Sequence, residues 1–252
     1  MKNSEKKIIN FRKMNKSVFL QFKKPYQSTI EFEKFIKRKH GFKKTNKIID
    51  IGCNIGAQLQ YFSKKNPSIK FVGSDYNKSA IYWANKINKN KNITFLKNDF
   101  IKDNKKLKNK YDGIICIQTF CELKDPEKAI KNLCSINSSW IAINSLFYEG
   151  LLEVKINMRD LKKIYANGKT EYYYKKNSID GDFNIHSLPR IKILFKYFGY
   201  KIYYERHIPK NKISFSNKKK RGSYTIKSAS GQEILFSGPV HLPWYFIFAK
   251  KI

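Results

Sequence analysis

The stretch IIDIGCNIGA, at residues 48–57, combines an acid with two glycines at a predicted strand end. Asp50 lies two residues before Gly52, and Gly56 follows four residues later. Glycines at the first strand-to-helix turn of an open parallel sheet let the backbone approach a ligand. Asp75 closes the next predicted strand, where a carboxylate can accept both hydroxyls of a ribose. These residues predict a site for a nucleotide-like cofactor, and both NAD and an adenosyl cofactor fit them.

Two details of this turn distinguish the candidate cofactors. The dinucleotide pattern GxGxxG requires a glycine at position 54 and a small residue at position 57, where the chain has Asn54 and Ala57. Asp50 would repel a pyrophosphate, whereas an acid at this position suits a cationic ligand. The turn therefore favours the adenosyl cofactor.

With Asp50, Gly52 and Gly56 in DIGCNIGA, the chain resembles the class I S-adenosylmethionine-dependent methyltransferases. The first motif of that family reads acid, any residue, glycine, then two further small positions. Asn54 replaces the usual middle glycine, and asparagine tolerates a positive φ better than other non-glycine residues. The segments SDY, KNDF and YDGIICIQT follow in the family's order, and the resemblance covers about residues 46–146.

The resemblance implies S-adenosylmethionine as the cofactor and a role for each matched residue. Asp75 would hold the ribose hydroxyls and Asp99 the adenine amino group, while Tyr76 or Phe100 would cover a face of the adenine. The turn around Gly52 would hold the methionine portion. The expected cofactor-binding residues are Asp50, Gly52, Cys53, Asn54, Gly56, Asp75, Tyr76, Asp99, Phe100 and Gln118.

A second resemblance concerns the acceptor and extends loosely over residues 140–252. NSLFYEG, NIHSLPR and the tail from RGSYT to FSGPVHLPWYF are similar to methyltransferases associated with bacterial capsule and other surface-polysaccharide biosynthesis. This resemblance implies methyl transfer to an oxygen of a small anionic acceptor, such as a nucleotide-linked sugar or a phosphoramidate intermediate. A basic surface would suit a phosphorylated or nucleotide-linked molecule of this kind.

A neutral hydroxyl acceptor requires a base within hydrogen-bond reach, whereas an anionic phosphoramidate oxygen requires none. The candidates for the base or for acceptor binding are His186, Glu149 and Tyr148, with His241 and Tyr245 as weaker ones. Each has a structural alternative, because an isolated histidine, a loop acid and a tyrosine also serve as hydrogen-bonding, solvated or packing residues. Gln118, Thr119 and Glu122 replace an acidic motif after the fourth strand, which disfavours DPPY-type amino-methylation of bases.

Short apolar segments alternate with helical patterns, which predicts an α/β fold: a Rossmann-like doubly wound sheet of seven strands with an antiparallel last strand. Ser28 and Glu31 fit a capping box for an N-terminal helix that Gly41 can close. Pro126 fits the first turn of a later helix. The predicted parallel strands are 46–51, 69–74, 92–97, 112–118 and 139–145.

After these strands the pattern becomes polar and irregular from Phe147 to Asn184. A helix capped by Ser187 and closed by Gly199 is then predicted, followed by a strand at 201–204, a hairpin and a final strand WYFIFAKK. We expect one methyltransferase domain at 1–252 whose inserted segments cover the substrate. Its expected parts are an N-terminal helical extension (1–45), a cofactor-binding half (46–146), an insertion (147–188) and a C-terminal half (189–252) with a hairpin insertion (209–243).

The chain carries 52 basic and 19 acidic residues, a formal net charge of +33. Such a charge attracts anions, including nucleic acid. The basic residues are mostly lysines spread along the chain, and the KKKR run at 218–221 is short, so nucleic acid is not the expected partner. An RNA methyltransferase and a non-catalytic adenosyl-binding protein remain the alternatives.

The four cysteines are expected to be buried, reduced thiols, since Cys53, Cys116, Cys121 and Cys134 show no CxxC spacing. No metal site is predicted. No apolar run approaches the length of a membrane span, and the start of the chain lacks the pattern of a signal peptide, so we expect a cytoplasmic protein. The sequence makes no prediction of the oligomeric state.

Overall fold

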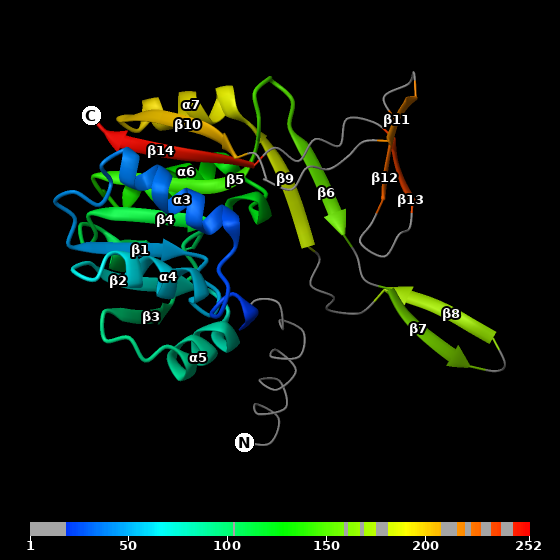
Figure 1. The fold of residues 1–252 in the computed structure, drawn as a ribbon, viewed down its shortest axis with the longest axis horizontal. Coiled ribbons are helices and arrows are strands. Elements are labelled where there is room, and N and C mark those ends of the chain that lie inside the picture. The colour runs from blue at the N-terminus through cyan, green and yellow to red at the C-terminus, as the bar shows by residue number, and fades with distance from the viewer. Residues whose placement is uncertain are drawn as a thin grey trace.

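The computed structural model describes residues 19–102, 104–158, 161–166, 169–174, 181–207, 216–219, 223–227, 233–237 and 244–252. A mixed β-sheet forms the centre of the molecule, with helices on both faces (Figure 1). β1 to β5 are parallel to one another, and β14 runs antiparallel between β5 and β10. This arrangement confirms the predicted Rossmann-like sheet with an antiparallel last strand. In spatial order the strands are β10 (Tyr200–His207), β14 (Trp244–Lys251), β5 (Trp140–Tyr148), β4 (Gly113–Ile117), β1 (Lys47–Ile51), β2 (Lys70–Asp75) and β3 (Ile93–Lys97).

Hydrophobic layers lie between the sheet and the helices on each face. The central strands are buried on both faces, so their sequences are almost continuously apolar, as in KIIDI of β1. Asp50 interrupts that run and is only 2% exposed. α3 (Gln27–Arg38), α4 (Ala57–Lys65) and α5 (Lys78–Ile87) pack on one face, and α6 (Pro126–Ser135) and α7 (Leu188–Tyr197) pack on the other.

Local signals set the starts of two helices. Asp125 precedes α6, and its carboxylate accepts the backbone N–H of Lys128 at 3.0 Å, while Pro126 occupies the first turn as predicted. Asn77 caps α5 by accepting the N–H of Ser79 at 2.9 Å. The latter cap fixes the chain directly after the carboxyl end of β2, where Asp75 lies.

The prediction of a capping box at the N-terminal helix is wrong. α3 begins at Gln27 and its N-cap residue is Tyr26, whose side chain makes no capping hydrogen bond. Glu31 instead accepts the side-chain amide of Gln27 at 2.8 Å with one oxygen, and its other oxygen lies 2.8 Å from Nδ1 of His207. The predicted cap of α7 is also only partly correct: Ser187 is the N-cap residue, but its hydroxyl donates to the carbonyl of Gly150 at 2.8 Å.

The segment that the sequence predicted as irregular, 147–184, contains paired strands. β6 (Val154–Met158) and β9 (Gly181–Ser187) form an antiparallel ladder, and β9 also pairs in parallel with the end of β5. Their pairing is between distant positions, which a local pattern does not show. β7 (Leu161–Ala166) and β8 (Lys169–Tyr174) form a separate antiparallel pair.

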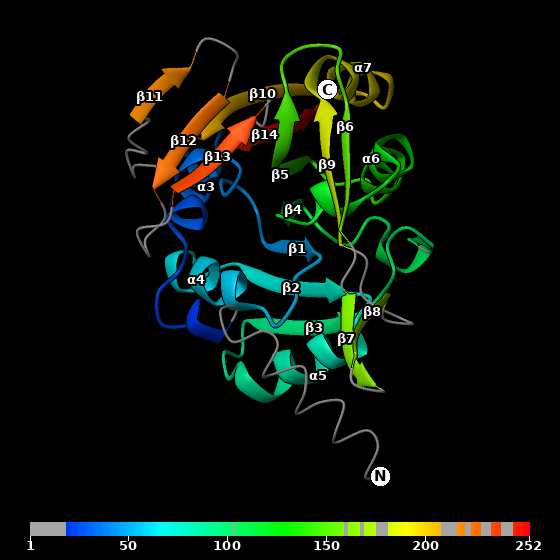
Figure 2. The same ribbon diagram turned by 90° about the vertical axis from the view of Figure 1, so that its right-hand side faces the viewer.

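The predicted hairpin after β10 is confirmed, since β12 (Ser223–Lys227) and β13 (Glu233–Ser237) are antiparallel, with β11 (Ser216–Lys219) beside β12. Figures 1 and 2 show that these strands, together with β6 to β9, lie on the side of the sheet where the parallel strands end. Ligands of open α/β sheets bind at that side. Within the described ranges, no helix has the length and apolar character needed to cross a membrane.

Candidate functional site

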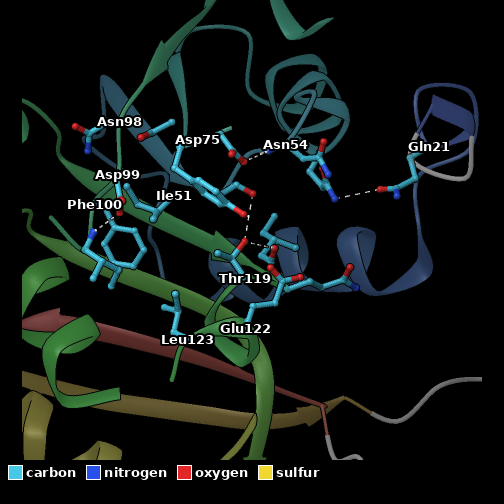
Figure 3. A pocket seen from close by; sticks show the side chains of 17 residues that line it. Gln21, Ile51, Asn54, Asp75, Asn98, Asp99, Phe100, Thr119, Glu122 and Leu123 are labelled. Atoms are coloured by element: carbon cyan, nitrogen blue, oxygen red, sulfur yellow. Dashed lines mark hydrogen bonds between the residues drawn. The ribbon is translucent and has the colours of Figure 1, made fainter. Parts of the chain in front are cut away.

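A cavity of about 440 Å³ opens at the carboxyl ends of β1, β2, β3 and β4 (Figure 3). Its wall includes Gly52 and Asn54 after β1, Asp75 at the end of β2, and Asp99 after β3. The sequence placed these residues at one edge because the ends of parallel strands meet there. The cavity is thus where the cofactor site was expected.

The turn after β1 adopts the conformation that its glycines allow. Gly52, Asn54 and Gly56 have φ values of 78°, 50° and 79°, so the prediction that Asn54 tolerates a positive φ is confirmed. A Cβ at Gly52 would lie 2.2 Å from Oγ1 of Thr119, whose hydroxyl donates to the Gly52 carbonyl at 3.2 Å. The position therefore requires glycine on two grounds, backbone conformation and the close approach of Thr119.

Gly56 has a packing role. A Cβ there would lie 2.5 Å from the ring of Phe95, and the residue does not line the cavity. Cys53 does not line the cavity either, since its side chain is buried in the hydrophobic layer below the turn. All four cysteines are buried free thiols, as predicted.

Asp75 holds the turn in place. Its Oδ2 accepts the backbone N–H of Asn54 at 2.9 Å, and its Oδ1 accepts that of Asn77 at 2.8 Å. Burial raises the pKa of this carboxyl, and the two hydrogen bonds oppose that rise. Only 8% of the residue is exposed. Asp75 lines the cavity, and each of its oxygens can accept a further hydrogen bond.

Asp50 lies behind the cavity wall and does not line the cavity. Its Oδ1 has no hydrogen-bond partner in the described part of the chain. Burial raises the pKa of Asp50 well above its usual value, and the charge of Asp75 raises it further. Two neighbouring buried carboxyls without a cation between them would be stabilised by a cationic ligand.

The residues after β3 form one end of the cavity. Asp99 accepts the N–H of Ile101 at 3.2 Å and pairs with Lys102 at 3.4 Å, so it also serves the local turn. Phe100 is 7% exposed and belongs to the core while lining the cavity. Tyr76 is 68% exposed at the rim. An apolar ring beside two polar rim residues is an arrangement that can receive a heteroaromatic base.

The chain after β4 forms the opposite wall. Gln118 has a positive φ of 58° and lines the cavity together with Thr119 and Glu122, the last from the short helix η2 (Phe120–Glu122). Burial, followed by the charge of Asp75, raises the pKa of Glu122. Glu122 was noted in the sequence only as a replacement within a motif, although its place shortly after a buried strand was a usable signal.

None of the three predicted catalytic residues lines the cavity. His186 is 1% exposed and lies in β9 against the ring of Phe120, with ring centroids 5.2 Å apart. The sequence predicted His186 directly before the cap of a helix, and it does precede Ser187, the N-cap residue of α7, although as part of a strand. Its Nε2 has no hydrogen-bond partner among the described residues, and burial lowers its pKa.

Tyr148 is the last residue of β5 and 42% exposed, and Glu149 follows it. Glu149 accepts the hydroxyl of Tyr245 at 2.5 Å. Burial and this hydrogen bond raise the pKa of Tyr245 to about 12. The other weak candidate, His241, lies outside the described residues.

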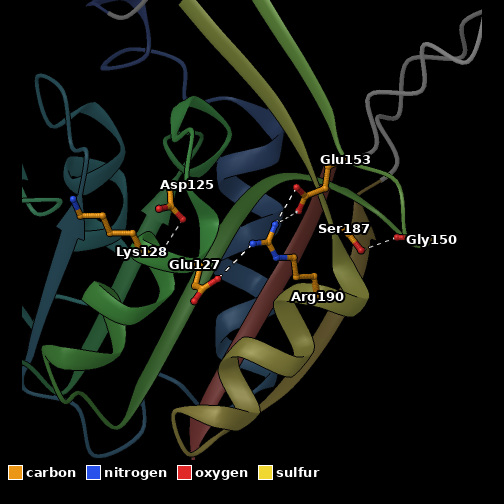
Figure 4. A network of polar contacts seen from close by, with 7 residues as sticks. All are labelled: Asp125, Glu127, Lys128, Gly150, Glu153, Ser187 and Arg190. Atoms are coloured by element: carbon orange, nitrogen blue, oxygen red, sulfur yellow. Dashed lines mark hydrogen bonds and ion pairs between the residues drawn. The ribbon is translucent and has the colours of Figure 1, made fainter.

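β9 nevertheless contributes to the cavity indirectly. Asn184, 3% exposed, donates to the carbonyls of Cys121 and Leu123 at 3.1 and 3.2 Å, which fixes the η2 turn. At its other end, β9 leads into α7, where Arg190 bridges Glu153 at 3.1 Å and Glu127 at 3.5 Å (Figure 4). The inserted strands are therefore tied to the wall that carries Glu122.

Sequence reasoning missed two glutamines. Gln21 lines the cavity from the chain before α3, and Gln58 lines it from the first turn of α4. The side-chain amide of Gln58 donates to Oε1 of Gln21 at 3.1 Å. No local motif marks Gln21, because its contact with the cavity depends on tertiary packing.

The cavity wall carries three carboxylates, those of Asp75, Asp99 and Glu122, and no lysine or arginine lines it within the described residues. In the same part of the chain, no group of three histidine, cysteine, aspartate or glutamate side chains could hold a metal ion. The arrangement suits a nucleoside with a cationic extension.

Residues 26–143 match a family model described as a methyltransferase domain. Similar solved structures include the N-terminal domain of EvdMO1 with S-adenosylhomocysteine (SAH) bound, with 11% identity, a TM-score of 0.56, and coverage of 90% of this chain and 82% of that chain. Another is magnesium protoporphyrin IX methyltransferase (ChlM) from Synechocystis with bound SAH. Its identity is 12% and its TM-score 0.52, and the match covers 90% of this chain and 83% of that chain.

A third is the YcgJ protein from Bacillus subtilis, with 13% identity, a TM-score of 0.56, and coverage of 88% of this chain and 98% of that chain. No curated protein sequence matches this chain significantly. At these identities, the solved structures show a shared fold.

Proposed function

We propose that this protein, which is an S-adenosylmethionine-dependent methyltransferase, transfers the methyl group to an oxygen of a small-molecule acceptor. The first candidate for the acceptor is a nucleotide-linked sugar or a phosphoramidate intermediate of surface-polysaccharide synthesis. The observation that carries the proposal is the cavity itself, which combines the turn after β1, a carboxylate at the end of β2 and an aromatic end after β3.

Two features of the cavity support the cofactor assignment. Gly52 lines the cavity without a side chain, and the unpartnered Oδ1 of Asp50 lies behind the same turn. We propose that Asp75 accepts the ribose hydroxyls, Asp99 the adenine amino group, and that Phe100 or Tyr76 covers the adenine. The bound cofactor supplies a methyl group that its sulfonium has already activated.

The protein's contribution is then alignment and exclusion of water. A hydroxyl acceptor also has to lose a proton, and a carboxylate within the cavity is better placed for this than a buried histidine. We propose Glu122 as that base, because it lines the cavity and its raised pKa makes it a stronger proton acceptor than an ordinary glutamate. Tyr148 and Glu149 at the end of β5 remain candidates for binding the rest of the acceptor.

The charges of the cavity wall and of the outer surface suit different parts of the acceptor. The carboxylates of Asp75, Asp99 and Glu122 disfavour an anionic acceptor group beside them, while the net charge of +33 favours anions at the outer surface. Of the two candidates, we therefore propose the nucleotide-linked sugar: its neutral hydroxyl enters the cavity and its phosphate stays outside, whereas a phosphoramidate would have to bring an anionic oxygen into the cavity. The RNA alternative depends on the run 218–221, of which residues 220–221 lie outside the described residues.

The test is methyl transfer from methyl-labelled S-adenosylmethionine to a panel of nucleotide-linked sugars, each paired with the analogue that lacks one hydroxyl. We expect label in one sugar and none in its deoxy partner. Glu122→Gln should lower the rate by about 10²–10⁴-fold with cofactor binding retained, whereas Glu127→Gln on α6 should not change it. Transfer to RNA alone, or an unchanged rate in Glu122→Gln, would contradict the proposal.

A further inference from the structure

The chain before α3 forms a turn that closes one end of the cavity. Backbone N–H groups of Phe22 and Lys23 donate to the carbonyls of Phe19 and Leu20 at 3.3 and 3.0 Å. The turn is held from two sides: the ring of Phe19 packs edge-on against Trp83 of α5, with centroids 5.7 Å apart, and Gln21 bonds to Gln58 of α4. It is therefore anchored to both helices that follow the cofactor-binding strands.

Gln21 presents a polar group to the cavity although it is almost buried. Only 6% of the residue is exposed, and it lines the cavity together with Gln58. Their mutual hydrogen bond uses Oε1 of Gln21 and Nε2 of Gln58. Among the described residues, no hydrogen bond occupies Nε2 of Gln21 or Oε1 of Gln58. The pair thus offers one free donor and one free acceptor side by side.

The position of this pair indicates which part of a ligand it would meet. In Figure 3, Asp99 and Phe100 lie at one end of the cavity, Gln21 lies at the opposite end, and Asp75 lies between them. With adenine beside Phe100 and ribose at Asp75, as proposed above, the amino-acid end of the cofactor points toward Gln21. That end carries an ammonium and a carboxylate.

No lysine or arginine lines the cavity among the described residues, so the donors that these residues offer to the carboxylate are neutral. A buried carboxylate needs such donors, because an unpaired buried charge is strongly unfavourable. The free Nε2 of Gln21 can donate to the carboxylate, and the free Oε1 of Gln58 can accept from the ammonium. The two amides complement a zwitterion.

We propose that Gln21 and Gln58 bind the amino-acid end of the cofactor, and that the turn at residues 19–24 is part of the cofactor site. This inference rests on the proposed function of the cavity. It adds a segment that precedes the matched methyltransferase domain at residues 26–143. The site is then completed by residues on both sides of β1.

The test compares two ligands by calorimetric titration of the whole chain. SAH carries the amino-acid end, and 5′-methylthioadenosine has the adenosine part but lacks that end. We expect Gln21→Ala to weaken SAH binding about tenfold or more and to change methylthioadenosine binding less than about twofold, because only SAH loses a hydrogen bond to a charged group. Gln21→Glu, which places a carboxylate next to a carboxylate, should weaken SAH binding at least as much.

Gln60→Ala on α4 is the matched control, since Gln60 does not line the cavity. Equal weakening of both ligands by Gln21→Ala, or no weakening of SAH, would overturn the inference. Failure of the unmodified protein to bind SAH would overturn the cofactor assignment itself, and the two failures are therefore distinguishable.

Discussion

Asp75 serves both the fold and the cavity, because its two oxygens accept backbone N–H groups while facing the site. A simple loss of binding after mutation would therefore be ambiguous. Asp112 provides a structural match at the amino ends of the strands, where one carboxylate oxygen accepts the N–H groups of Asn46 and Lys47 at 2.8 and 2.9 Å, away from the cavity.

We predict that Asp75→Asn weakens SAH binding roughly 10- to 100-fold, since a charge-assisted hydrogen bond to the ligand is lost. Asp112→Asn should lower the free energy of unfolding about as much as Asp75→Asn does, but it should leave SAH binding unchanged. Calorimetry and urea unfolding of the two variants measure both effects. If both variants bind SAH like the unmodified protein, Asp75 does not hold the ribose.

Asp50 predicts a pH dependence of stability. Burial and the charge of Asp75 raise its folded-state pKa above the usual 3.8, so ionisation is easier in the unfolded chain. The folded state therefore loses stability as the pH rises from about 4 through the folded-state pKa. Asp50→Asn removes this loss. The gain in unfolding free energy of the variant over the unmodified protein should be larger at pH 8 than at pH 5, as measured by urea unfolding.

The asparagine side chain of the variant needs its own hydrogen-bond partners, which costs the same free energy of unfolding at both pH values. Subtracting the result at pH 5 from that at pH 8 removes this constant cost. An identical difference at pH 5 and pH 8 would show that the Asp50 carboxyl titrates alike in the folded and unfolded chains.

At the scale of elements, the turn between β1 and α4 depends on contact with the chain after β4. Gly52 and Gly199 have nearly the same φ, 78° and 79°, but a Cβ at Gly199 meets no atom within 4 Å, whereas one at Gly52 meets Thr119. Gly199→Ala thus measures conformational strain alone. Gly52→Ala adds the steric clash.

We predict a loss of about 1–2 kcal/mol in unfolding free energy for Gly199→Ala. The loss for Gly52→Ala should exceed this by about 1–3 kcal/mol and should be accompanied by weaker SAH binding. Urea unfolding of both variants, with SAH titration of each, provides the measurement. Equal losses would mean that Thr119 moves aside at little cost.

The parallel strands of the sheet and the helices that pack on it were predictable. Buried parallel strands are short apolar runs, and α6 carries its own cap at Asp125. The Asn54 conformation was predictable from residue type. β6 and β9 were not, since their ladder depends on pairing between distant residues such as Val154 and Ile185. That pairing buries His186, and the tertiary fold brings Gln21 to the cavity, so neither position could be read from local patterns.

At the scale of the whole molecule, the net charge and the charge of the cavity wall have opposite signs. The chain has a net charge of +33, yet the cavity wall carries carboxylates and, within the described residues, no lysine or arginine. An overall positive field attracts anionic molecules to the surface, while the acidic cavity selects a cation. In the proposed reaction, the surface field favours the phosphate of the acceptor, and the cavity field favours the sulfonium of the cofactor.

The measurement that tests this account most directly is calorimetric titration of the purified, nucleic-acid-free protein with S-adenosylmethionine, SAH and NAD in parallel. The account predicts binding of both adenosyl ligands, at one site per chain, and no binding of NAD. Binding of NAD, or of none of the three, would contradict it, because the cavity between Asp75 and Asp99 would then not be a site for the adenosyl cofactor.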